Sequence, residues 1–449
     1  MPSPTQDAAR RRQTIVATTL GNALEYFDFT VYGFLALIIG KLFFPAFDAY
    51  GQLLLAVGTF GVGFVMRPLG GIMIGAYADR AGRKKAMVLT IFLMALGCGL
   101  IAVAPTYAQI GVAAPILIVV ARALQGFSAG GEFGASTTLL VEHSTPSGRG
   151  YMASWQFASQ GLGVALAALV VAALSYGLTP QAMESWGWRV PFAIGLVIAP
   201  VGAYLRRHLE ETLSEENRTP AATAPKAARR SAFSTVCREH GRTVLKAIVI
   251  TMGGTGASYV VTFYMPTYAI RELGMSPAVA LAGAALTGLL TFLLAPLVGR
   301  WTDRAGRKPL IIWARIALVV LVYPAFLWLK TSPTPIVLFT IVGGLTMVLA
   351  VQAVPSITIL PEMFPERVRA TGMSLVYGFG VAVFGGFAPL ISTWLVNASG
   401  HKEAPSWYLV ATALISLPAL LYLKDRTGEA LDQPGSPIPA PALAAAPQL

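Results

Sequence analysis

The sequence predicts an all-α integral membrane protein with twelve transmembrane helices in two six-helix bundles and both termini in the cytoplasm. Three observations predict it: the chain is mainly apolar, its basic residues gather on one side of the predicted spans, and one hexapeptide occurs once in each half. Of the 449 residues, 55% are hydrophobic and only 12% are charged, too few charges to cover a soluble protein of this size. Lipid must therefore cover much of the surface.

The apolar stretches are long enough for twelve spans. A spanning helix needs about 20 mainly apolar residues, because hydrocarbon offers no partner to free backbone groups. This requirement predicts spans at 14–40, 52–77, 86–105, 112–141, 151–177, 189–205, 243–270, 278–299, 309–329, 335–360, 370–396 and 406–423. The predicted organisation is a cytoplasmic segment 1–13, a bundle 14–206, a polar linker 207–242, a second bundle 243–424 and a disordered cytoplasmic tail 425–449.

The distribution of Lys and Arg sets the orientation. With a cytoplasmic N-terminus, only five of the 33 basic residues reach the opposite side, namely Lys41, Arg189, Arg271, Lys330 and Lys402. Three more, Arg67, Arg122 and Arg315, lie inside spans. Basic residues prefer cytoplasmic loops, so the net charge of +12 is mostly a signal of topology. We expect no nucleic-acid partner, because no soluble basic domain is present.

The first span and the cysteines need separate interpretation. The apolar stretch after Arg12 carries Glu25 and Asp28 and lacks a small-residue cleavage site, so it is predicted to be retained rather than removed as a secretory signal. The two cysteines, Cys98 in a span and Cys237 in the linker, predict no disulfide framework.

Two loop patterns recur in the same order in both halves. The hexapeptide Asp-Arg-Ala-Gly-Arg-Lys starts at Asp79 and again at Asp303. Further on, a Glu is followed seven residues later by an Arg, at Glu142 and Arg149 and again at Glu362 and Arg369. This repetition predicts parallel repeats, two bundles that rock about a central cavity.

These motifs resemble a known family. The stretch Gly75 to Lys85 and its copy Gly299 to Lys308 are similar to the loop motif of the major facilitator superfamily. Five further stretches resemble one family within it, the metabolite:proton symporters. They are Gly21 to Phe29, Arg67 to Gly71, Arg122 to Glu132, Trp186 to Phe192 and Pro361 to Pro365. The resemblance covers the chain up to about Lys424 and implies the major facilitator fold and a transporter.

The substrate class follows from the same resemblance. The family includes carriers of citrate and related tricarboxylates, of 2-oxoglutarate and other dicarboxylates, of shikimate, and of the zwitterions proline and betaine. A short Pro/Ala-rich tail without heptads, the stretch Phe384 to Pro389 and the loop Gly400 to Trp407 look more like the citrate carriers. We expect proton-coupled uptake of a small organic acid, citrate or a related tri- or dicarboxylate, by alternating access. The alternative is uptake of a zwitterionic osmolyte (proline or betaine) or a shikimate-like metabolite.

Charged residues inside spans are candidates for proton coupling, because burying a charge at mid-bilayer costs about 2.5 to 3.5 kcal/mol. Glu25 and Asp28 share one face of the first span, and two carboxylates in low dielectric disfavour double ionisation, so one of them can carry a proton. The alternative is that one of them pairs with a buried Arg for structure alone. The resemblance implies a part in proton transfer for Arg122. Glu132, in the same span, is a second titrating site or a gate partner.

Substrate contacts are predicted from cations and polar side chains inside spans. If Arg67 and Arg122 both line the cavity, two fixed cations favour an anion. Arg315, seven residues after Lys308, is expected to snorkel to the interface instead. The polar candidates are Asn22, Gln125, Gln156, Gln160, Tyr259, Tyr264, Gln352 and Tyr377.

The repeated loops predict a gate on the cytoplasmic side. An Asp before a Gly turn and basic residues can cap a helix and form ion pairs across the bundles. By resemblance the gate residues are Asp79, Arg83, Glu142, Arg149, Asp303, Arg307, Glu362 and Arg369. The alternative is that the basic residues only enforce topology.

Other functional classes lack support in the sequence. No metal-ligand cluster is apparent, and the four His residues lie at loops or helix ends, so we expect neither an enzyme nor a metal site. No cofactor is expected, because the proton gradient would drive transport. The expected partners are an organic anion, protons and the lipid bilayer of a bacterial inner (plasma) membrane, with a functional monomer.

Overall fold

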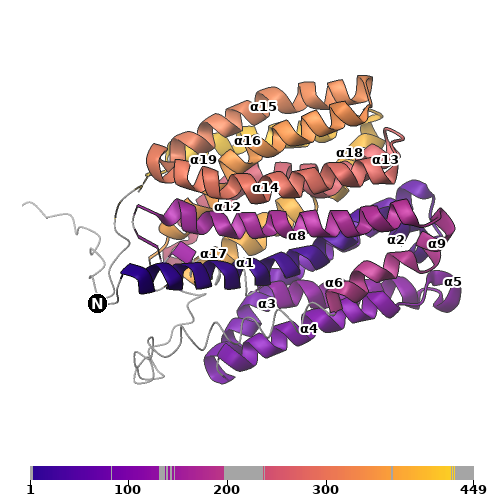
Figure 1. Ribbon diagram of the computed structural model, residues 1–449, viewed down its shortest axis with the longest axis horizontal. Helices are drawn as coiled ribbons and strands as arrows, with labels where there is room; N and C mark the ends of the chain where they lie inside the picture. Colours follow the sequence, from indigo (N-terminus) through magenta and orange to yellow (C-terminus); the bar gives the residue numbers. More distant parts are fainter. Residues whose placement is uncertain are drawn as a thin grey trace, which may run out of the picture.

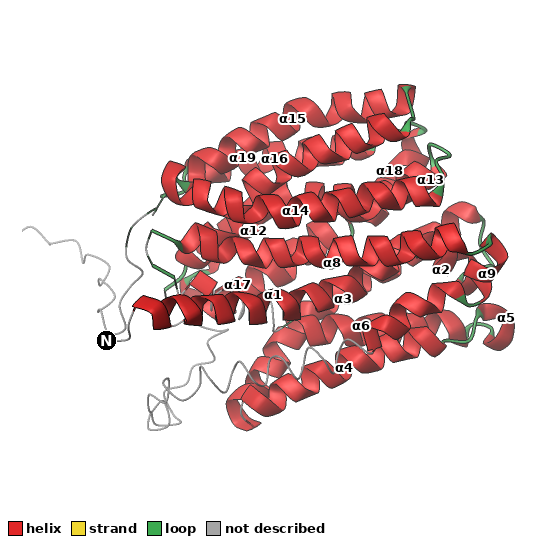
Figure 2. Ribbon diagram, viewed as in Figure 1, coloured by secondary structure: helices red, strands yellow, loops and turns green. Residues whose placement is uncertain are grey.

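The protein is helical throughout the part that the structure, a computed structural model, describes (Figure 2). The described residues are 4–81, 83–130, 137, 140, 141, 144, 145, 147–196, 236, 238–365, 368–425, 427 and 429. Within these helices the side chains of residues 4–14, 17, 18 and 370 and of most of 75–87 are not described.

The first half of the chain contributes a set of long helices joined by short ones. They are α1 (Pro4–Phe34), α2 (Ala36–Phe43), α3 (Ala49–Ala81), α4 (Arg83–Val103), α5 (Tyr107–Ile110), α6 (Ala113–Ala129), α8 (Arg149–Gly177), α9 (Pro180–Ser185) and the 3-10 turn η1 (Gly187–Arg189).

The second half contributes α12 (Gly241–Tyr259), η4 (Val260–Tyr264), α13 (Met265–Arg271), α14 (Pro277–Ala305), α15 (Arg307–Thr331), α16 (Pro335–Glu362), α17 (Arg369–Val376), η6 (Tyr377–Gly386), α18 (Ala388–Ser399) and α19 (Pro405–Leu421). Local sequence sets several of these boundaries. The Ser276 hydroxyl accepts from the Val279 N–H at the start of α14, and Pro277 follows at a position that needs no N–H. Gly400, at φ 70°, ends α18.

The spanning helices only partly reproduce the predicted count. Among the described residues, seven helices are long and apolar enough to cross a membrane, or eight if α1 and α2 form one span. Three shorter apolar helices cover Val88–Val103, Ala113–Ala129 and Pro405–Leu421. The predicted span 189–205 runs beyond the described residues. A total of twelve therefore stays a prediction.

Three predicted spans are not continuous α-helices. The first bends by 60° between α1 and α2. The span predicted at 243–270 contains the π-helical segment η4, and the one at 370–396 contains η6. Pro266 and Pro389 lie just after these segments. A proline offers no N–H to the preceding turn, which favours such local departures from the α-helix.

The helices of the two halves pack together, and α8 and α14 lie side by side along their length (Figure 1). They meet through two glycine pairs. An added Cβ at Gly161 would lie 2.7 Å from the Gly288 carbonyl oxygen, and one at Gly150 would lie 2.7 Å from that of Gly299. Small residues let helix backbones approach this closely. The contact thus joins the two halves of the chain.

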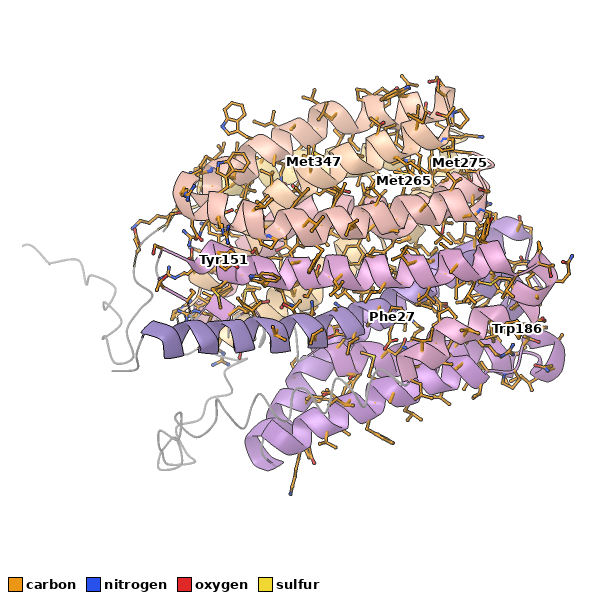
Figure 3. The ribbon with its side chains drawn as sticks, in the orientation of Figure 1. Phe27, Tyr151, Trp186, Met265, Met275 and Met347 are labelled. Atoms are coloured by element: carbon orange, nitrogen blue, oxygen red, sulfur yellow. The ribbon has the colours of Figure 1, made fainter. Side chains whose placement is uncertain are left out.

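Side chains fill the space between the helices and also project from the bundle (Figure 3). Tyr151 and Trp186, labelled there, mark its opposite ends. Large apolar side chains are exposed on α15, where Trp313 is 69% and Val320 is 62% accessible. A soluble protein rarely exposes so much apolar surface, so lipid contact explains this face.

Candidate functional site

A cavity lies between α1, α8, α12 with η4, α14 and α16. Its lining atoms leave about 460 Å³ of space, part of it open to solvent. It is lined by Tyr26, Phe157, Gln160, Gly161, Val164, Ser258, Tyr259, Thr262, Phe263, Thr287, Gly288, Thr291, Thr346 and Leu349. Both halves of the chain contribute, and the Gly161–Gly288 contact forms part of its wall.

The cavity wall is uncharged and largely apolar, with polar groups placed among apolar side chains. Hydroxyls, one amide and aromatic rings line it, and several hydroxyls already donate to their own helix, such as Thr291 Oγ1 to the Thr287 carbonyl oxygen at 2.8 Å. Of the predicted substrate contacts, only Gln160 and Tyr259 belong to the lining. Neither Arg67 nor Arg122, which would favour an anion if both lined the cavity, is among the residues that line it here.

The remaining polar candidates lie elsewhere in the bundle. Asn22 donates to Ser159 Oγ at 2.6 Å and so holds α1 against α8, the helix that also carries Gln156. Tyr264 interacts with Thr393. Gln352 donates to the Gly254 carbonyl oxygen at 3.4 Å. Tyr377 lies near Tyr26 and Tyr259, and therefore near the cavity wall.

Arg67 lies one side chain behind the cavity wall. Its guanidinium is 4.4 Å from the ring centroid of Phe29 and 4.3 Å from that of Phe64. It also interacts with Tyr26, which does line the cavity. Aromatic faces thus partly offset this buried charge.

Arg122 is completely buried between aromatic rings and a polar network. Its Cζ lies 4.5 Å from the ring centroids of both Phe29 and Tyr32. Its Nη1 donates to Gln125 Oε1 at 2.8 Å, and Gln125 Nε2 donates to Cys98 Sγ at 3.0 Å. Arg122 and Asp28 interact electrostatically without a direct ion pair.

Asp28 is buried on the side of α1 that faces α4 and α6. The Cys98 side chain lies beside its carboxylate, close enough for the thiol to interact with it. Gly195 lies against it so closely that any side chain there would overlap the Asp28 carboxylate. Glu25 is also buried and interacts with Tyr26. The structure brings Asp28 close to Cys98 and Arg122.

The expectation that Arg315 snorkels to the interface is wrong. Arg315 is fully buried. Its Nη1 donates to Ser416 Oγ at 2.7 Å and its Nη2 to the Ile250 carbonyl oxygen at 3.2 Å, while Nε reaches Gln352 Oε1 at 3.5 Å. These partners come from α19, α12 and α16, so Arg315 connects α15 with three other helices of the second half.

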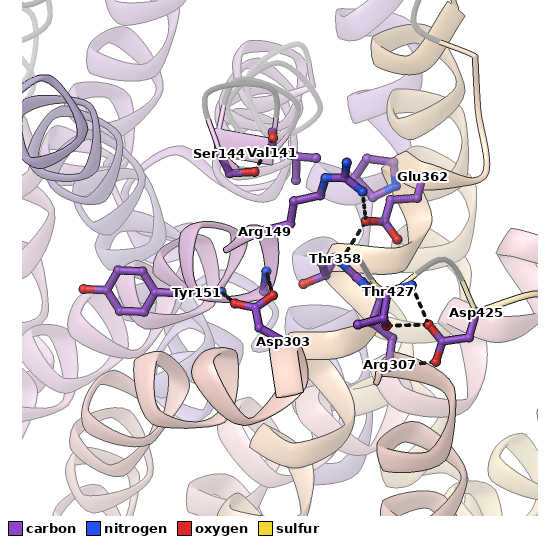
Figure 4. Close-up of polar contacts among 12 residues, drawn as sticks. Val141, Ser144, Arg149, Tyr151, Asp303, Arg307, Thr358, Glu362, Asp425 and Thr427 are labelled. Atoms are coloured by element: carbon purple, nitrogen blue, oxygen red, sulfur yellow. Dashed lines mark hydrogen bonds and ion pairs between the residues drawn. The ribbon is translucent and has the colours of Figure 1, made fainter. Parts of the chain in front are cut away.

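Four predicted gate residues meet at one end of the bundle (Figure 4). Asp303 caps the N-terminus of α8, because its Oδ1 accepts from Gly150 N at 2.7 Å and its Oδ2 from Tyr151 N at 2.9 Å. The Glu362 carboxylate accepts from Arg149 Nη1 at 3.0 Å and pairs with Arg307 Nη2 at 2.9 Å. We call Arg149, Asp303, Arg307 and Glu362 the latch.

The other gate predictions fare differently. Arg369 is buried, and its Nε donates to the Pro361 carbonyl oxygen at 3.1 Å, next to the latch. The side chains of Asp79, Arg83 and Glu142 lie outside the described residues, as does Glu132 from the proton-coupling set.

Asp425 supports the latch from the start of the predicted tail. Its Oδ2 accepts from the backbone N–H groups of Arg307 and Lys308, each at 2.9 Å, at the beginning of α15. Partial burial would raise the pKa of Asp425, but hydrogen bonds from Thr427 and these N–H groups outweigh burial and hold that pKa below its ordinary value.

The residues that the sequence did not single out share one property. Tyr26, Ser258, Thr262, Thr287 and Thr291 are hydroxyl-bearing residues of the cavity lining. Ser258 with Thr262, and Thr287 with Thr291, are spaced four apart, which places each pair on one helix face. That spacing is the sequence feature from which these lining residues could have been predicted. No such feature marks Cys98 or Asp425, because a lone thiol and an acidic residue in a loop are both common.

No candidate metal centre emerges from the described positions, where three or more His, Cys, Asp or Glu side chains never gather closely enough to hold an ion.

Comparison with known proteins identifies relatives over almost the whole chain. The profile of the Major Facilitator Superfamily matches residues 18–353 and 257–446. The chain is 36% identical to the citrate-proton symporter of Klebsiella pneumoniae, over 93% of each sequence. It is 35% identical to the alpha-ketoglutarate permease of Escherichia coli, over 93% of this chain and 94% of the relative.

Other proteins similar to this chain are named for different substrates. The glycine betaine/proline/ectoine/pipecolic acid transporter OusA of Dickeya dadantii is 33% identical, over 95% of this chain and 85% of the relative. Among solved structures, the proton:xylose symporter XylE superposes with a TM-score of 0.73 over 95% of this chain and 98% of that one, at 17% identity. At this identity the likeness concerns the fold.

Proposed function

Because the chain belongs to the Major Facilitator Superfamily, we propose that it is a proton-coupled symporter that takes up a small organic acid by alternating access. The substrate in this proposal is citrate or a related tri- or dicarboxylate. The curated relatives named above are transporters and not enzymes. In this proposal the proton gradient supplies the driving force and no cofactor takes part.

The proposal includes the number of spans, their division into two bundles and their orientation in the membrane. Twelve spans form two six-helix bundles, 14–206 and 243–424, joined by the linker 207–242. Segments 1–13 and 425–449 lie in the cytoplasm. The protein is located in the bacterial inner membrane and functions as a monomer. The gathering of Lys and Arg on one side of the spans supports this orientation, and the exposed apolar face of α15 supports the lipid contact.

One observation carries the proposal: α1 has the cavity on one side and the buried carboxylate on the other. Tyr26 lines the cavity, whereas Asp28, two residues later, faces Cys98 and Arg122. Residues two apart on an α-helix point in roughly opposite directions. Any movement of α1 on substrate binding therefore reaches the site where Asp28 gains or loses its proton.

The anion preference rests on Arg67. Its charge lies directly behind Tyr26 and is offset by aromatic rings. A carboxylate in the cavity would attract this guanidinium, which is well suited to bidentate binding. The similarity to a citrate-proton symporter and to an alpha-ketoglutarate permease supports the same class of substrate.

The latch supplies a gate for alternating access. Arg149 belongs to the first half and Glu362 to the second, so their ion pair holds the two halves together at one end of the bundle. Opening that end requires breaking this pair and the cap of Asp303 on α8. The described conformation is therefore closed at the end that we propose faces the cytoplasm.

A second substrate class is supported by the cavity itself. Its lining is uncharged and includes the aromatic rings of Tyr26, Phe157, Tyr259 and Phe263. Aromatic faces bind quaternary ammonium groups. Transporters named for betaine and proline are also among the relatives of this chain. A zwitterionic osmolyte is thus the alternative substrate, with a shikimate-like metabolite as a further one.

Counterflow in proteoliposomes tests the proposal. Labelled citrate is offered to vesicles loaded with unlabelled citrate, and citrate, 2-oxoglutarate, shikimate, proline and betaine are tested as competitors, with and without an inward proton gradient. Competition by carboxylates and gradient-driven accumulation in the wild type, with accumulation lost in Asp28→Asn, support the proposal. Counterflow restricted to labelled betaine or proline supports the alternative and removes the anion role of Arg67.

A further inference from the structure

Two neutral side chains stand in a row between Arg122 and Asp28. Arg122 Nη1 donates to Gln125 Oε1 at 2.8 Å, and Gln125 Nε2 donates to Cys98 Sγ at 3.0 Å. The Cys98 thiol in turn lies beside the Asp28 carboxylate, in position to donate to it. The two charged groups are therefore joined through an amide and a thiol.

The chemistry of the ends fixes the direction of this row. A guanidinium can only donate, so the amide oxygen of Gln125 must face Arg122 and its NH₂ must face Cys98. A sulfur that accepts from this NH₂ leaves its own S–H free to donate to the Asp28 carboxylate. All three hydrogen bonds then run from Arg122 towards Asp28, an arrangement that polarises each bond in the row.

Close packing holds the row in place. Cys98 and Gln125 are fully buried and Asp28 is 4% exposed. An added Cβ at Gly97 would lie 2.6 Å from Gln125 Cγ, and one at Gly195 would overlap the Asp28 carboxylate. Neither side chain has room to turn away, so a change at one end of the row is felt at the next member.

The groups around Asp28 show how its carboxylate is connected to Arg122. Towards Asp28, α4 presents Cys98 and α6 presents Arg122, and Gly195 contributes backbone only. Arg122 additionally interacts with Tyr32 and Arg67. Among the described residues, Cys98 is thus placed to connect Asp28 with the rest of this cluster.

We infer that Cys98 is a positioning residue for proton coupling, which orients the Asp28 carboxylate and links its protonation to Arg122. The inference rests on the proposed function and extends it. When Asp28 takes up a proton, its carboxylate becomes a neutral carboxylic acid and accepts the S–H bond less strongly, while the thiol keeps its own proton. The loosened Cys98 weakens the Gln125 contact in turn, and Arg122 is then free to shift.

Two substitutions at Cys98 give opposite expectations. A donor to a carboxylate favours its charged form. Cys98→Val removes the donor, so half-maximal gradient-driven uptake moves to higher pH, by about 0.5 to 1 unit for the loss of a weak hydrogen bond. Cys98→Ser replaces S–H by the stronger donor O–H, so the same midpoint moves to lower pH. A packing role alone would not shift the two midpoints in opposite directions.

The matched control is Cys237→Ser, which changes the only other thiol of the chain, in the predicted linker. It is expected to leave the pH profile at the wild-type position. Midpoints of Cys98→Val and Cys98→Ser that both coincide with the wild type overturn the inference, as does a shift of both in one direction.

A second measurement does not depend on transport. In the Cys237→Ser background, Cys98 is the sole thiol, and a hydrogen bond lowers its S–H stretching frequency in the infrared spectrum. Asp28→Asn replaces the carboxylate by a weaker acceptor, so the band is expected to rise in frequency. An unchanged band overturns the inference even if transport is proton-coupled. A wild type without gradient-driven accumulation defeats the proposed function, and the band shift still decides whether Cys98 binds Asp28.

Discussion

Asp303 of α14 accepts a hydrogen bond from the backbone N–H of Gly150, the second residue of α8, at 2.7 Å. A carboxylate at this position neutralises the positive end of the α8 helix dipole and satisfies N–H groups that have no partner within the helix. Since Asp303 and Gly150 belong to different halves of the chain, the cap joins those halves. Loss of the carboxylate charge should weaken closure without removing a helix.

We predict that Asp303→Asn opens this end of the bundle more often. An amide still accepts one hydrogen bond but carries no charge, so closure should weaken by about 1 kcal/mol, a several-fold change in the open population. The measurement is the labelling rate of Ser154→Cys, a fully buried position beside the latch, with a membrane-permeant maleimide in the Cys237→Ser background. Equal labelling rates with and without the Asp303→Asn substitution would contradict the prediction.

Glu362 should matter more for stability than Arg149. Glu362 pairs with both Arg149 and Arg307, so Glu362→Gln strands two buried guanidinium groups, whereas Arg149→Gln leaves the pair with Arg307. Breaking a buried pair costs about 3 to 5 kcal/mol. We expect Glu362→Gln to lower the Tm in detergent more than Arg149→Gln does.

The control for this comparison is Lys41→Gln. Lys41 pairs with Glu184 at 2.6 Å, but the two side chains are 59% and 33% exposed. Exposed pairs contribute about 0 to 1 kcal/mol, so the Tm should hardly change. A Tm loss for Arg149→Gln equal to that for Glu362→Gln would show that Arg307 does not share the carboxylate.

The glycine contact at the cavity offers a third test. An added Cβ at Gly161 would lie 2.6 Å from Phe292 N and 2.7 Å from the Gly288 carbonyl oxygen, both backbone atoms of α14. Gly161→Ala must push α8 and α14 apart, and overpacking of this kind costs about 1 to 3 kcal/mol. We expect lower Tm and strongly reduced counterflow.

Gly177→Ala is the matched control on the same helix. Nothing lies within 4 Å of an added Cβ there, so this variant should behave as the wild type in both measurements. Normal counterflow by Gly161→Ala would mean that the α8–α14 contact relaxes without consequence.

The sequence was most informative where a physical requirement extends over many residues. Apolar length predicts spanning helices because every backbone group in lipid needs an internal partner, and the repeated loops predict that Asp303, Arg307, Glu362 and Arg149 belong to one candidate gate. Their contacts are present in the structure, whereas their role in gating stays a prediction.

The sequence was least informative where a side chain's role depends on a distant partner. Arg315 lies only eight residues from the start of α15, which suggests an interfacial position, yet its partner Ser416 is 101 residues away. From the sequence alone, Thr287 and Thr291 look like packing residues of a helix. Only the position of α8 opposite them makes them part of a cavity wall. Cys98 is unremarkable in the sequence because its partners, Gln125 and Asp28, come from two other helices.

The opposite end of the bundle should show a defined acid dependence. Lys330 Nζ donates to Glu403 Oε2 at 2.8 Å and holds the pKa of Glu403 below its usual range. A carboxylate with a lowered pKa stabilises the folded state above its unfolded pKa, about 4.3, and this contribution is lost as the pH falls through the lower folded value.

We therefore expect Glu403→Gln to lower the Tm slightly at pH 7, by about 1 to 2 °C because Lys330 is partly exposed. The difference from the wild type should disappear well below pH 4. Thermal unfolding between pH 3 and pH 7 measures it, and Lys330→Gln should show the same loss of pH dependence. A difference that grows towards acid pH would have the wrong sign.

The side-chain geometry around Arg122 predicts that charge alone cannot replace this residue. Its guanidinium packs against Phe29 and Tyr32 and donates to Gln125. A lysine ammonium is a compact point charge that cannot both stack on these rings and reach Gln125 in the same geometry. Arg122→Lys should therefore keep the fold but reduce gradient-driven uptake at least about tenfold, which corresponds to about 1.4 kcal/mol.

Arg300→Lys provides the matched comparison. Arg300 is exposed and lies 4.9 Å from the Tyr151 ring centroid, a cation–π contact without a buried polar partner. Exposed contacts of this kind contribute about 0.5 to 1 kcal/mol, so initial uptake rates should remain near those of the wild type. If Arg122→Lys also transports at wild-type rates while keeping its Tm, the guanidinium of Arg122 serves burial and packing only, and the link through Gln125 to Asp28 does not carry coupling.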